Sequence, residues 1–203
     1  MKRALALLSG GFDSAVGIKL MQDKLEIVAL HFSLEPFTDD TPEKKSLELV
    51  KKLNIKEFYV INHSEEHSLI AKKCDSRYYY IISRRLMYKV AEEVAKKLKC
   101  DFILDGCNLG QVSSQTLSNL TTITQVVNIP VLHPLLSYDK DQIIKLAKKF
   151  DTFELSKGPE MCNVLGPKHP ATRSKLDFIE REESKVKINE LFESSLKNLR
   201  KVL

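Results

Sequence analysis

Short apolar runs alternate along this chain with stretches in which apolar residues recur at the spacing of a helix. The apolar runs predict strands over Ala4–Leu8, Glu26–His31, Glu57–Asn62, Asp101–Asp105 and Val131–Leu132. The periodic stretches predict helices over Asp13–Gln22, Thr41–Leu53, Tyr79–Lys99 and Asp139–Phe150. Strands that alternate with helices predict an α/β fold, in which a parallel sheet carries helices on both faces.

Two of the predicted helices begin with recognisable signals. Pro42 stands at the first position of one helix, where its missing N–H costs nothing. Asp139 followed by Gln142 fits a capping box at another. The charged segment 176–203 is predicted as a helical tail, which packs on or extends from a main domain over residues 1–175.

The junction between the first strand and the first helix carries the strongest chemical signal. The segment Ser9–Ser14 reads Ser-Gly-Gly-Phe-Asp-Ser, a glycine turn that leads into a helix. Such a turn presents backbone N–H groups and the positive end of a helix dipole to an anion, and its glycines let a phosphate approach the backbone. No lysine is present in the turn, so the motif is not a Walker loop. The alternative is a structural serine–glycine turn in which Asp13 caps the helix.

Composition indicates the general class of the protein but does not specify its activity. The 203 residues are 43% hydrophobic and 29% charged, which suits one soluble globular domain. The net charge of +5 permits a polyanionic partner such as RNA without requiring one.

No apolar run approaches the roughly 20 residues that span a bilayer, and the first strand begins too close to Met1 for a leader, so we expect no membrane association and a cytoplasmic location. The four cysteines form no Cys-x-x-Cys pair, which argues against structural zinc or a disulfide framework.

A second polar segment, Asp105–Thr116, directly follows the fourth predicted strand. It therefore lies at the same edge of the sheet as Ser9–Ser14, where α/β proteins bind their ligands. Its small and amide-bearing residues allow close contact with a ligand. The alternative is a polar turn that caps a helix.

Several motifs in order along the chain resemble one family. The segment Ser9–Ser14 resembles the PP-loop of the ATP pyrophosphatases, which split ATP into AMP and pyrophosphate. The string Gly-x-x-Leu-Gly-Gln-Val-Ser-Ser-Gln-Thr-Leu, the string Pro-Leu-Leu-Ser-Tyr-Asp-Lys, a later cysteine and Lys-His-Pro resemble the PP-loop domain of the tRNA 4-thiouridine synthetases, the ThiI-type tRNA sulfurtransferases. The resemblance runs from Leu7 to about Lys175 and implies an adenine nucleotide alpha-hydrolase-like fold.

The resemblance also implies site residues. The positions that match the family's ATP contacts are Leu7, Leu8, Ser9, Gly10, Gly11, Ser14, Phe32, Ser33, Arg84, Gly106 and Gln115. Asp13 matches a catalytic carboxylate near Mg²⁺, a cation that prefers oxygen ligands. Phe32 would cover the adenine, or it is a core aromatic. Arg84 would neutralise phosphate charge, or it is a solvated helix residue.

Sulfur chemistry requires a thiolate or a persulfide. Cys162 matches the family's catalytic cysteine, with an incidental loop cysteine as the alternative. Cys107 is a candidate second redox thiol that would pair with Cys162, although a small packed side chain fits it better. Cys74 and Cys100 are expected to be structural.

Two departures from the family shape the expected cofactors and partners. Some archaeal relatives hold an iron–sulfur cluster with a Cys-x-x-Cys at the start of the long helix, but Tyr80 and Ser83 stand there here, so we expect no cluster and a persulfide donor protein instead. The family's N-terminal THUMP region and the rhodanese domain of some members have no counterpart in the sequence. Binding of tRNA would then fall to a separate RNA-binding chain or to basic residues, for which the candidates are Arg77, Arg84, Arg85, Lys89, Lys168 and Arg173. A homodimer is one oligomeric state that the sequence leaves open.

The resemblance implies an ATP- and Mg²⁺-dependent enzyme that adenylates a tRNA uridine, releases pyrophosphate and installs sulfur to give 4-thiouridine. One alternative is the same chemistry on another base or a small molecule. Another is a non-catalytic subunit that binds adenine nucleotides.

Overall fold

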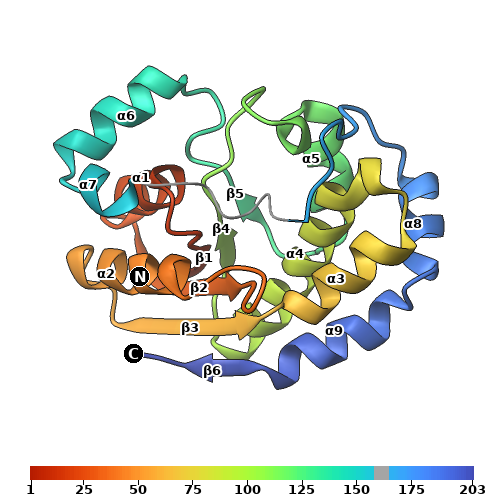
Figure 1. Cartoon of the computed structure of the whole chain (residues 1–203). Coiled ribbons are helices and arrows are strands. Elements are labelled where there is room, and N and C mark those ends of the chain that lie inside the picture. The colour runs from red at the N-terminus through yellow and green to blue at the C-terminus, as the bar shows by residue number, and fades with distance from the viewer. Residues whose placement is uncertain (158–164) are drawn as a thin grey trace.

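One six-stranded sheet in the order β5-β4-β1-β2-β3-β6 forms the centre of the molecule (Figure 1). The computed structural model describes residues 1–157 and 165–203. The strands are β1 (Lys2–Leu7), β2 (Leu25–Ser33), β3 (Glu57–Asn62), β4 (Phe102–Leu104), β5 (Val131–Leu132) and β6 (Leu199–Lys201). The first five strands are parallel to their neighbours, whereas β6 is antiparallel to β3.

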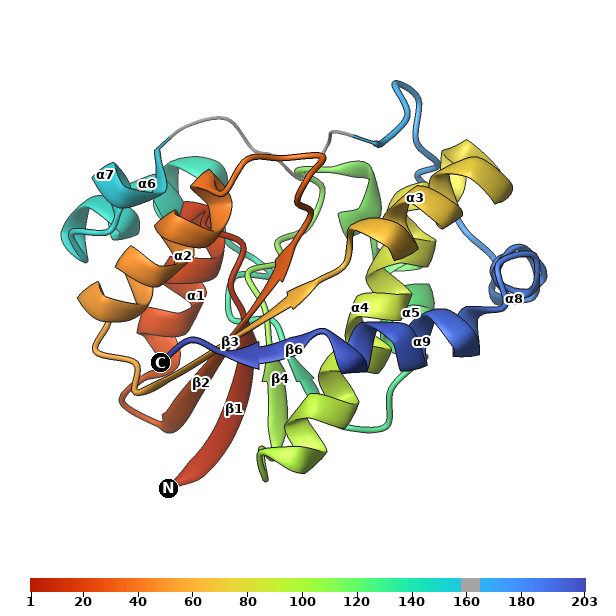
Figure 2. The same cartoon turned by 60° about the horizontal axis from the view of Figure 1, so that its bottom comes forward.

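Helices cover both faces of the sheet, as Figure 2 shows. On one face lie α1 (Phe12–Met21), α2 (Thr41–Lys52), α6 (Lys140–Lys149) and α7 (Phe153–Ser156). On the other face lie α3 (Ser64–Lys73), α4 (Tyr79–Lys97), α5 (Leu117–Thr124), α8 (Leu176–Ser184) and α9 (Ile188–Lys197). Short 3₁₀ turns, η1 (Ser76–Tyr78) and η2 (Ser113–Gln115), precede α4 and α5.

The alternation of side chains along the strands divides the core in two. Leu5, Val28 and Leu30 point towards α4, whereas Ala4, Ala6 and Ala29 belong to the core beneath α1 and α2. Both faces of β1 and β2 are thus buried, which is why these strands read as nearly continuous apolar runs.

The predicted strands and the predicted helices are confirmed, including Pro42 at the start of α2 and the capping box of Asp139 and Gln142 at α6. Helix α3 was not predicted, because the face that it buries includes Ser64, Glu66 and His67 rather than a regular apolar stripe. The tail, predicted to be helical, ends in the strand β6; two of the three residues of β6 are charged.

The last 28 residues pack on the same sheet as the rest of the chain, through α9 against α4 and β6 against β3. A domain boundary at residue 175 stays a prediction. Within the described ranges, no helix combines the length and the apolar character needed to cross a membrane.

Candidate nucleotide site

The carboxyl ends of β1, β2 and β4 meet at one edge of the sheet, because these strands are parallel neighbours. The predicted nucleotide residues lie at or just after these ends: Leu7–Ser14 at β1, Phe32 and Ser33 at β2, and Gly106 with the polar segment after β4. This is the edge at which open α/β sheets bind their ligands. Leu7 pairs with Leu30 in register and Leu8 N donates to Leu30 O, so these two residues anchor the start of the loop to β2.

The loop Ser9–Ser14 combines a glycine turn with two serine hydroxyls, ahead of Phe12 and Asp13 in the first turn of α1. Gly10 has a φ of +84°, a left-handed conformation that glycine adopts without strain. The Ser14 hydroxyl donates to Gly11 O at 2.9 Å and lies 3.3 Å from Ser9 Oγ. Gly11 is the N-cap of α1 and makes no side-chain cap to the first-turn N–H groups. The helix start therefore keeps its capacity to bind an anion such as phosphate.

Gly106 follows Asp105, the first residue after β4, and packs directly on this helix start. A Cβ atom at Gly106 would lie 2.6 Å from Asp13 C and Ser14 N, a distance at which the backbone would have to move. Only glycine permits this approach. The two segments predicted to hold the nucleotide are thus in contact, and the contact depends on one missing methyl group.

The end of β2 contributes Phe32, which is half-buried. Its ring centroid lies 5.2 Å from that of His63, the residue after β3. Burial keeps the pKa of the fully buried His63 well below its usual value, so this ring is neutral. Ser33 is buried, and its hydroxyl accepts a hydrogen bond from Glu35 N at 3.3 Å. One side of Phe32 therefore packs on protein, and its role over adenine stays a prediction.

Arg84 is held in a mostly buried network and is therefore not a solvated helix residue. Its guanidinium projects from α4, donates to Cys107 Sγ at 2.6 Å and lies 3.5 Å from Asp105 Oδ2. It also lies 3.4 Å from Ser114 Oγ in the polar segment. Burial lowers the pKa of Arg84, but the surrounding Cys107, Tyr88 and Asp105 raise it by more, so the guanidinium stays charged.

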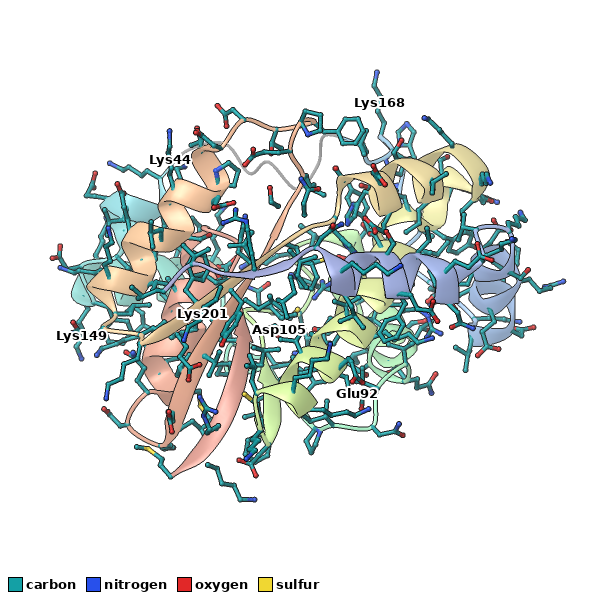
Figure 3. The ribbon with its side chains drawn as sticks, turned by 90° about the horizontal axis from the view of Figure 1, so that it is seen from below. Lys44, Glu92, Asp105, Lys149, Lys168 and Lys201 are labelled. Atoms are coloured by element: carbon teal, nitrogen blue, oxygen red, sulfur yellow. The ribbon has the colours of Figure 1, made fainter. Side chains whose placement is uncertain are left out.

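Asp105 is the centre of this network and lies near the middle of the molecule (Figure 3). Its carboxylate accepts hydrogen bonds from His133 Nδ1 at 2.7 Å, from Cys107 N at 3.0 Å and from the Tyr88 hydroxyl. Burial raises the pKa of Asp105, but the hydrogen bond and charge of His133 and the charge of Arg84 outweigh it and lower the pKa to about 2. One carboxylate thus fixes side chains from α4, from the loop after β4 and from the residue after β5.

Asp105, Cys107 and His133 also form the one cluster of potential metal ligands found in residues 1–157 and 165–203, with ligand atoms within 4.8 Å of one another. Oxygen, sulfur and nitrogen donors would suit zinc. However, each of the three is already hydrogen-bonded, and the Arg84 guanidinium occupies the space beside the sulfur. Because this cation repels a second one, the geometry favours a hydrogen-bonded network over a metal centre.

Two amide side chains in the polar segment have buried polar atoms that lack partners among the described residues. Both polar atoms of the Asn108 side chain are buried without a hydrogen bond, and so is Gln115 Oε1. Buried polar groups normally find partners, and those that do not often await a ligand, ion or water. The unpaired amide oxygen of Gln115 therefore fits its predicted contact with the nucleotide.

Three of the four cysteines lie within the described residues, and all three are buried. Cys162 lies outside the described residues. Burial raises the pKa of Cys107 to about 12, so its sulfur is a thiol that donates to Asp105 at 2.9 Å. Burial also raises the pKa of Cys74 and of Cys100 to about 11. All three described cysteines are therefore poor nucleophiles where they stand.

The basic residues suggested for RNA binding are not all on the surface. Arg85 is buried, with Nε donating to Glu183 Oε1 at 2.6 Å, so it and Arg84 cannot belong to an exposed basic helix. Arg77 and Arg173 are exposed, and Lys168 projects from the surface in Figure 3.

Comparison with known proteins identifies the family. A family model described as Thiamine biosynthesis protein (ThiI) matches residues 1–188. The chain belongs to the ThiI family. Within it, a protein of Moorella thermoacetica named "Probable tRNA sulfurtransferase" is 38% identical over 204 residues, which cover 97% of this chain and 52% of that protein. The chain spans about half the length of the curated relatives that it matches.

Solved structures confirm the ThiI fold of the chain. The crystal structure of a 4-thiouridine synthetase–RNA complex with bound ATP matches with a TM-score of 0.93 at 31% identity and covers 99% of this chain and 55% of that one. An NH3-dependent NAD synthetase from Campylobacter jejuni shares the fold alone, with a TM-score of 0.59 at 17% identity over 96% of this chain and 84% of its own. The roles of individual residues stay predictions.

Tyr88, Asp105, Asn108 and His133 contribute to the site although no individual role is predicted for them from the sequence. Position offers a signal for two of them, because Asp105 and His133 each directly follow the apolar run of a predicted strand, at the edge where the site forms. Tyr88 lies among the apolar residues of α4, and nothing in its spacing distinguishes it from core.

Proposed function

We propose that this chain is the ATP-dependent catalytic domain of a sulfurtransferase that converts a uridine of tRNA to 4-thiouridine. The observation that carries the proposal is the contact of the Ser9–Ser14 loop with Gly106, which joins an anion-binding helix start to a polar segment with unpaired amides. The likeness to an ATP-bound 4-thiouridine synthetase supports the same assignment.

In the first step, uridine O4 attacks the α-phosphorus of ATP and pyrophosphate leaves, which gives an adenylated base. The loop N–H groups and the Ser9 and Ser14 hydroxyls would hold the phosphates, and Arg84 at the rim of the polar segment would add positive charge. The protein contributes mainly position and charge stabilisation, as is usual for transfer at phosphorus. Asp13, in the first turn of α1, would hold Mg²⁺, a hard cation that neutralises phosphate charge.

In the second step, the terminal sulfur of a Cys162 persulfide attacks C4 of the base and AMP leaves. The base is then linked to Cys162 through an S–S bond, and a second thiol must break this bond to release 4-thiouridine and leave a disulfide. Cys107 is one candidate for that thiol, but it would have to leave its buried, protonated state. A thiol of the persulfide donor or a small-molecule thiol needs no such rearrangement.

The deciding experiment incubates the chain with ATP, Mg²⁺, a small-molecule persulfide as the sulfur donor, a reducing thiol and unmodified tRNA, and separates AMP plus pyrophosphate from ADP plus phosphate. We expect AMP, pyrophosphate and 4-thiouridine in the RNA digest. Asp13→Ala should abolish pyrophosphate release. Cys162→Ser should block sulfur transfer while ATP still binds, whereas Cys100→Ser, which changes a cysteine at the opposite end of the sheet, should do neither.

Each alternative has its own result. Pyrophosphate release that does not require tRNA and leaves no thionucleoside would point to a small-molecule acceptor. ATP binding without any turnover would point to a nucleotide-binding subunit.

A further inference from the structure

A cleft lined by residues of α5, of α8 and of the segment before α8 carries an arrangement that the nucleotide site does not use. Its cavity of about 390 Å³ is lined by Tyr78, Ser118, Arg173, Ser174, Lys175 and Phe178. That volume falls within the range of about 300–1,000 Å³ typical of small-ligand sites.

Two aromatic rings, tilted against each other, form one wall of the cleft. The ring centroids of Tyr78 and Phe178 lie 4.8 Å apart at an interplanar angle of 44°. Guanidinium groups flank both rings, with Arg77 at 5.7 Å from the Tyr78 centroid and Arg181 at 5.5 Å from that of Phe178. Both aromatic side chains are only half-buried, so apolar ring surface is left at the cleft.

The charge of the cleft is positive. Arg173 and Lys175 are the charged residues among those that line it, and both are exposed. Across residues 1–157 and 165–203, neither forms an ion pair or donates a side-chain hydrogen bond to a protein group. Unpaired cations beside an aromatic wall are the combination that binds a nucleotide, because phosphate meets the cations and a base stacks on the ring.

The cleft is tied to the nucleotide site by a set of hydrogen bonds. Asn119 Nδ2, which is fully buried, donates to Ala171 O at 2.9 Å and to Ser113 O at 2.6 Å. Thr116 Oγ1 donates to Thr172 O at 2.8 Å. The segment that carries Arg173 is thus fixed to the turn that contains Gln115.

We propose that this cleft holds one unpaired nucleotide of the RNA substrate, with its base on the Tyr78–Phe178 wall and its phosphate between Arg173 and Lys175. The inference rests on the proposed function, which supplies RNA as the partner. Single-stranded positions are the ones that RNA-binding proteins read by stacking, since paired bases hide their faces. An acidic peptide would use the cations but leave the aromatic wall without a counterpart.

The test measures the affinity of the whole chain for an unmodified tRNA and for a fluorescein-labelled single-stranded oligouridylate. Phe178→Leu keeps an apolar side chain but removes the ring face, so Kd should rise about tenfold. Phe178→Tyr should restore binding. The matched control is Phe102→Leu, which removes a ring beside Lys2 at the amino end of β4 and should leave Kd unchanged.

The charges have a separate readout. Arg173→Gln combined with Lys175→Gln should reduce the slope of log K against log salt by about 0.7 for each cation. Lys145→Gln combined with Lys149→Gln changes charge equally on α6, and Lys149 lies across the molecule from α8 (Figure 3), so the slope should not move.

Three results would overturn the proposal: RNA that fails to bind, Phe178→Leu that binds as tightly as the parent chain, or polyglutamate that competes as well as oligouridylate. ATP binding and pyrophosphate release in the Phe178→Leu variant, with excess tRNA, separate the two failures. Turnover with unchanged RNA affinity means that only the cleft is wrongly assigned, whereas no turnover in any variant counts against the proposed function.

Discussion

The ends of β1 and β4 are neighbours in the sheet, yet they are built in opposite ways. The Ser9–Ser14 loop opens with a serine and two glycines and leads into the start of α1. At the end of β4, the Asp105 carboxylate is surrounded in the interior by a guanidinium, a phenol, an imidazole and a thiol. The two meet at Gly106. We expect the backbone of the loop to meet the phosphates, while the Asp105 network behind it holds the neighbouring segments in place.

The largest effect on folding stability is expected when the Asp105 network loses its central carboxylate. Asp105→Asn keeps the shape of the side chain but leaves the Arg84 cation without its carboxylate. Breaking a buried charge pair in this way costs about 3–5 kcal/mol of folding stability. Urea unfolding checks this, and Asp101→Asn, which changes an exposed carboxylate at the other end of β4, is the control. Equal stability of the two variants would mean that the network supports nothing.

Low pH should reduce the difference in stability between the parent chain and Asp105→Asn. The pKa of Asp105 in the folded chain, about 2, lies below its ordinary value near 3.9, so the carboxylate stabilises the fold above pH 4. This stabilisation is lost as the pH falls from about 4 towards 2. The gap in unfolding free energy between the parent chain and Asp105→Asn should therefore narrow between pH 5 and pH 3, and a constant gap would contradict the charged state assigned to Asp105.

A smaller effect is expected where the two regions touch. Gly106→Ala inserts a methyl group 2.6 Å from backbone atoms, which should cost about 1–3 kcal/mol and weaken ATP binding by displacing the helix start. Gly11→Ala is the matched control for stability alone, because a Cβ there meets only Ser9 Oγ at 3.4 Å. Thermal unfolding of both variants distinguishes the contact from a general effect of alanine, and isothermal titration of Gly106→Ala with ATP measures the effect on binding.

The smallest effect concerns Asn108, whose amide is buried without a partner. Asn108→Ala removes two unpaired polar atoms, so stability without ligand should stay within about 1 kcal/mol of the parent chain or increase. ATP affinity should nevertheless fall if the amide serves the ligand. A variant that loses stability and keeps its ATP affinity would place Asn108 among ordinary structural residues.

The same two regions show what a sequence reveals and what it hides. Ser9–Ser14 is a continuous string whose turn chemistry can be read directly, and the alternation of apolar runs predicted the parallel sheet around it. The Asp105 network joins Arg84 and Tyr88 of α4 to His133, residues that become neighbours only when β4 and β5 pair. Helix α3 was not predicted for a related reason, because its buried face includes Ser64 and Glu66, residue types that are mostly exposed.

The sheet described above ends in two very short strands. Its outermost members are β5, with two residues, and β6, whose three residues include Arg200 and Lys201. Neither offers a long row of free amide and carbonyl groups on which another polypeptide could extend the sheet, and β6 carries charged side chains at its edge. The short edge strands β5 and β6 therefore protect the chain against edge-to-edge aggregation, to which open sheets are prone at high concentration.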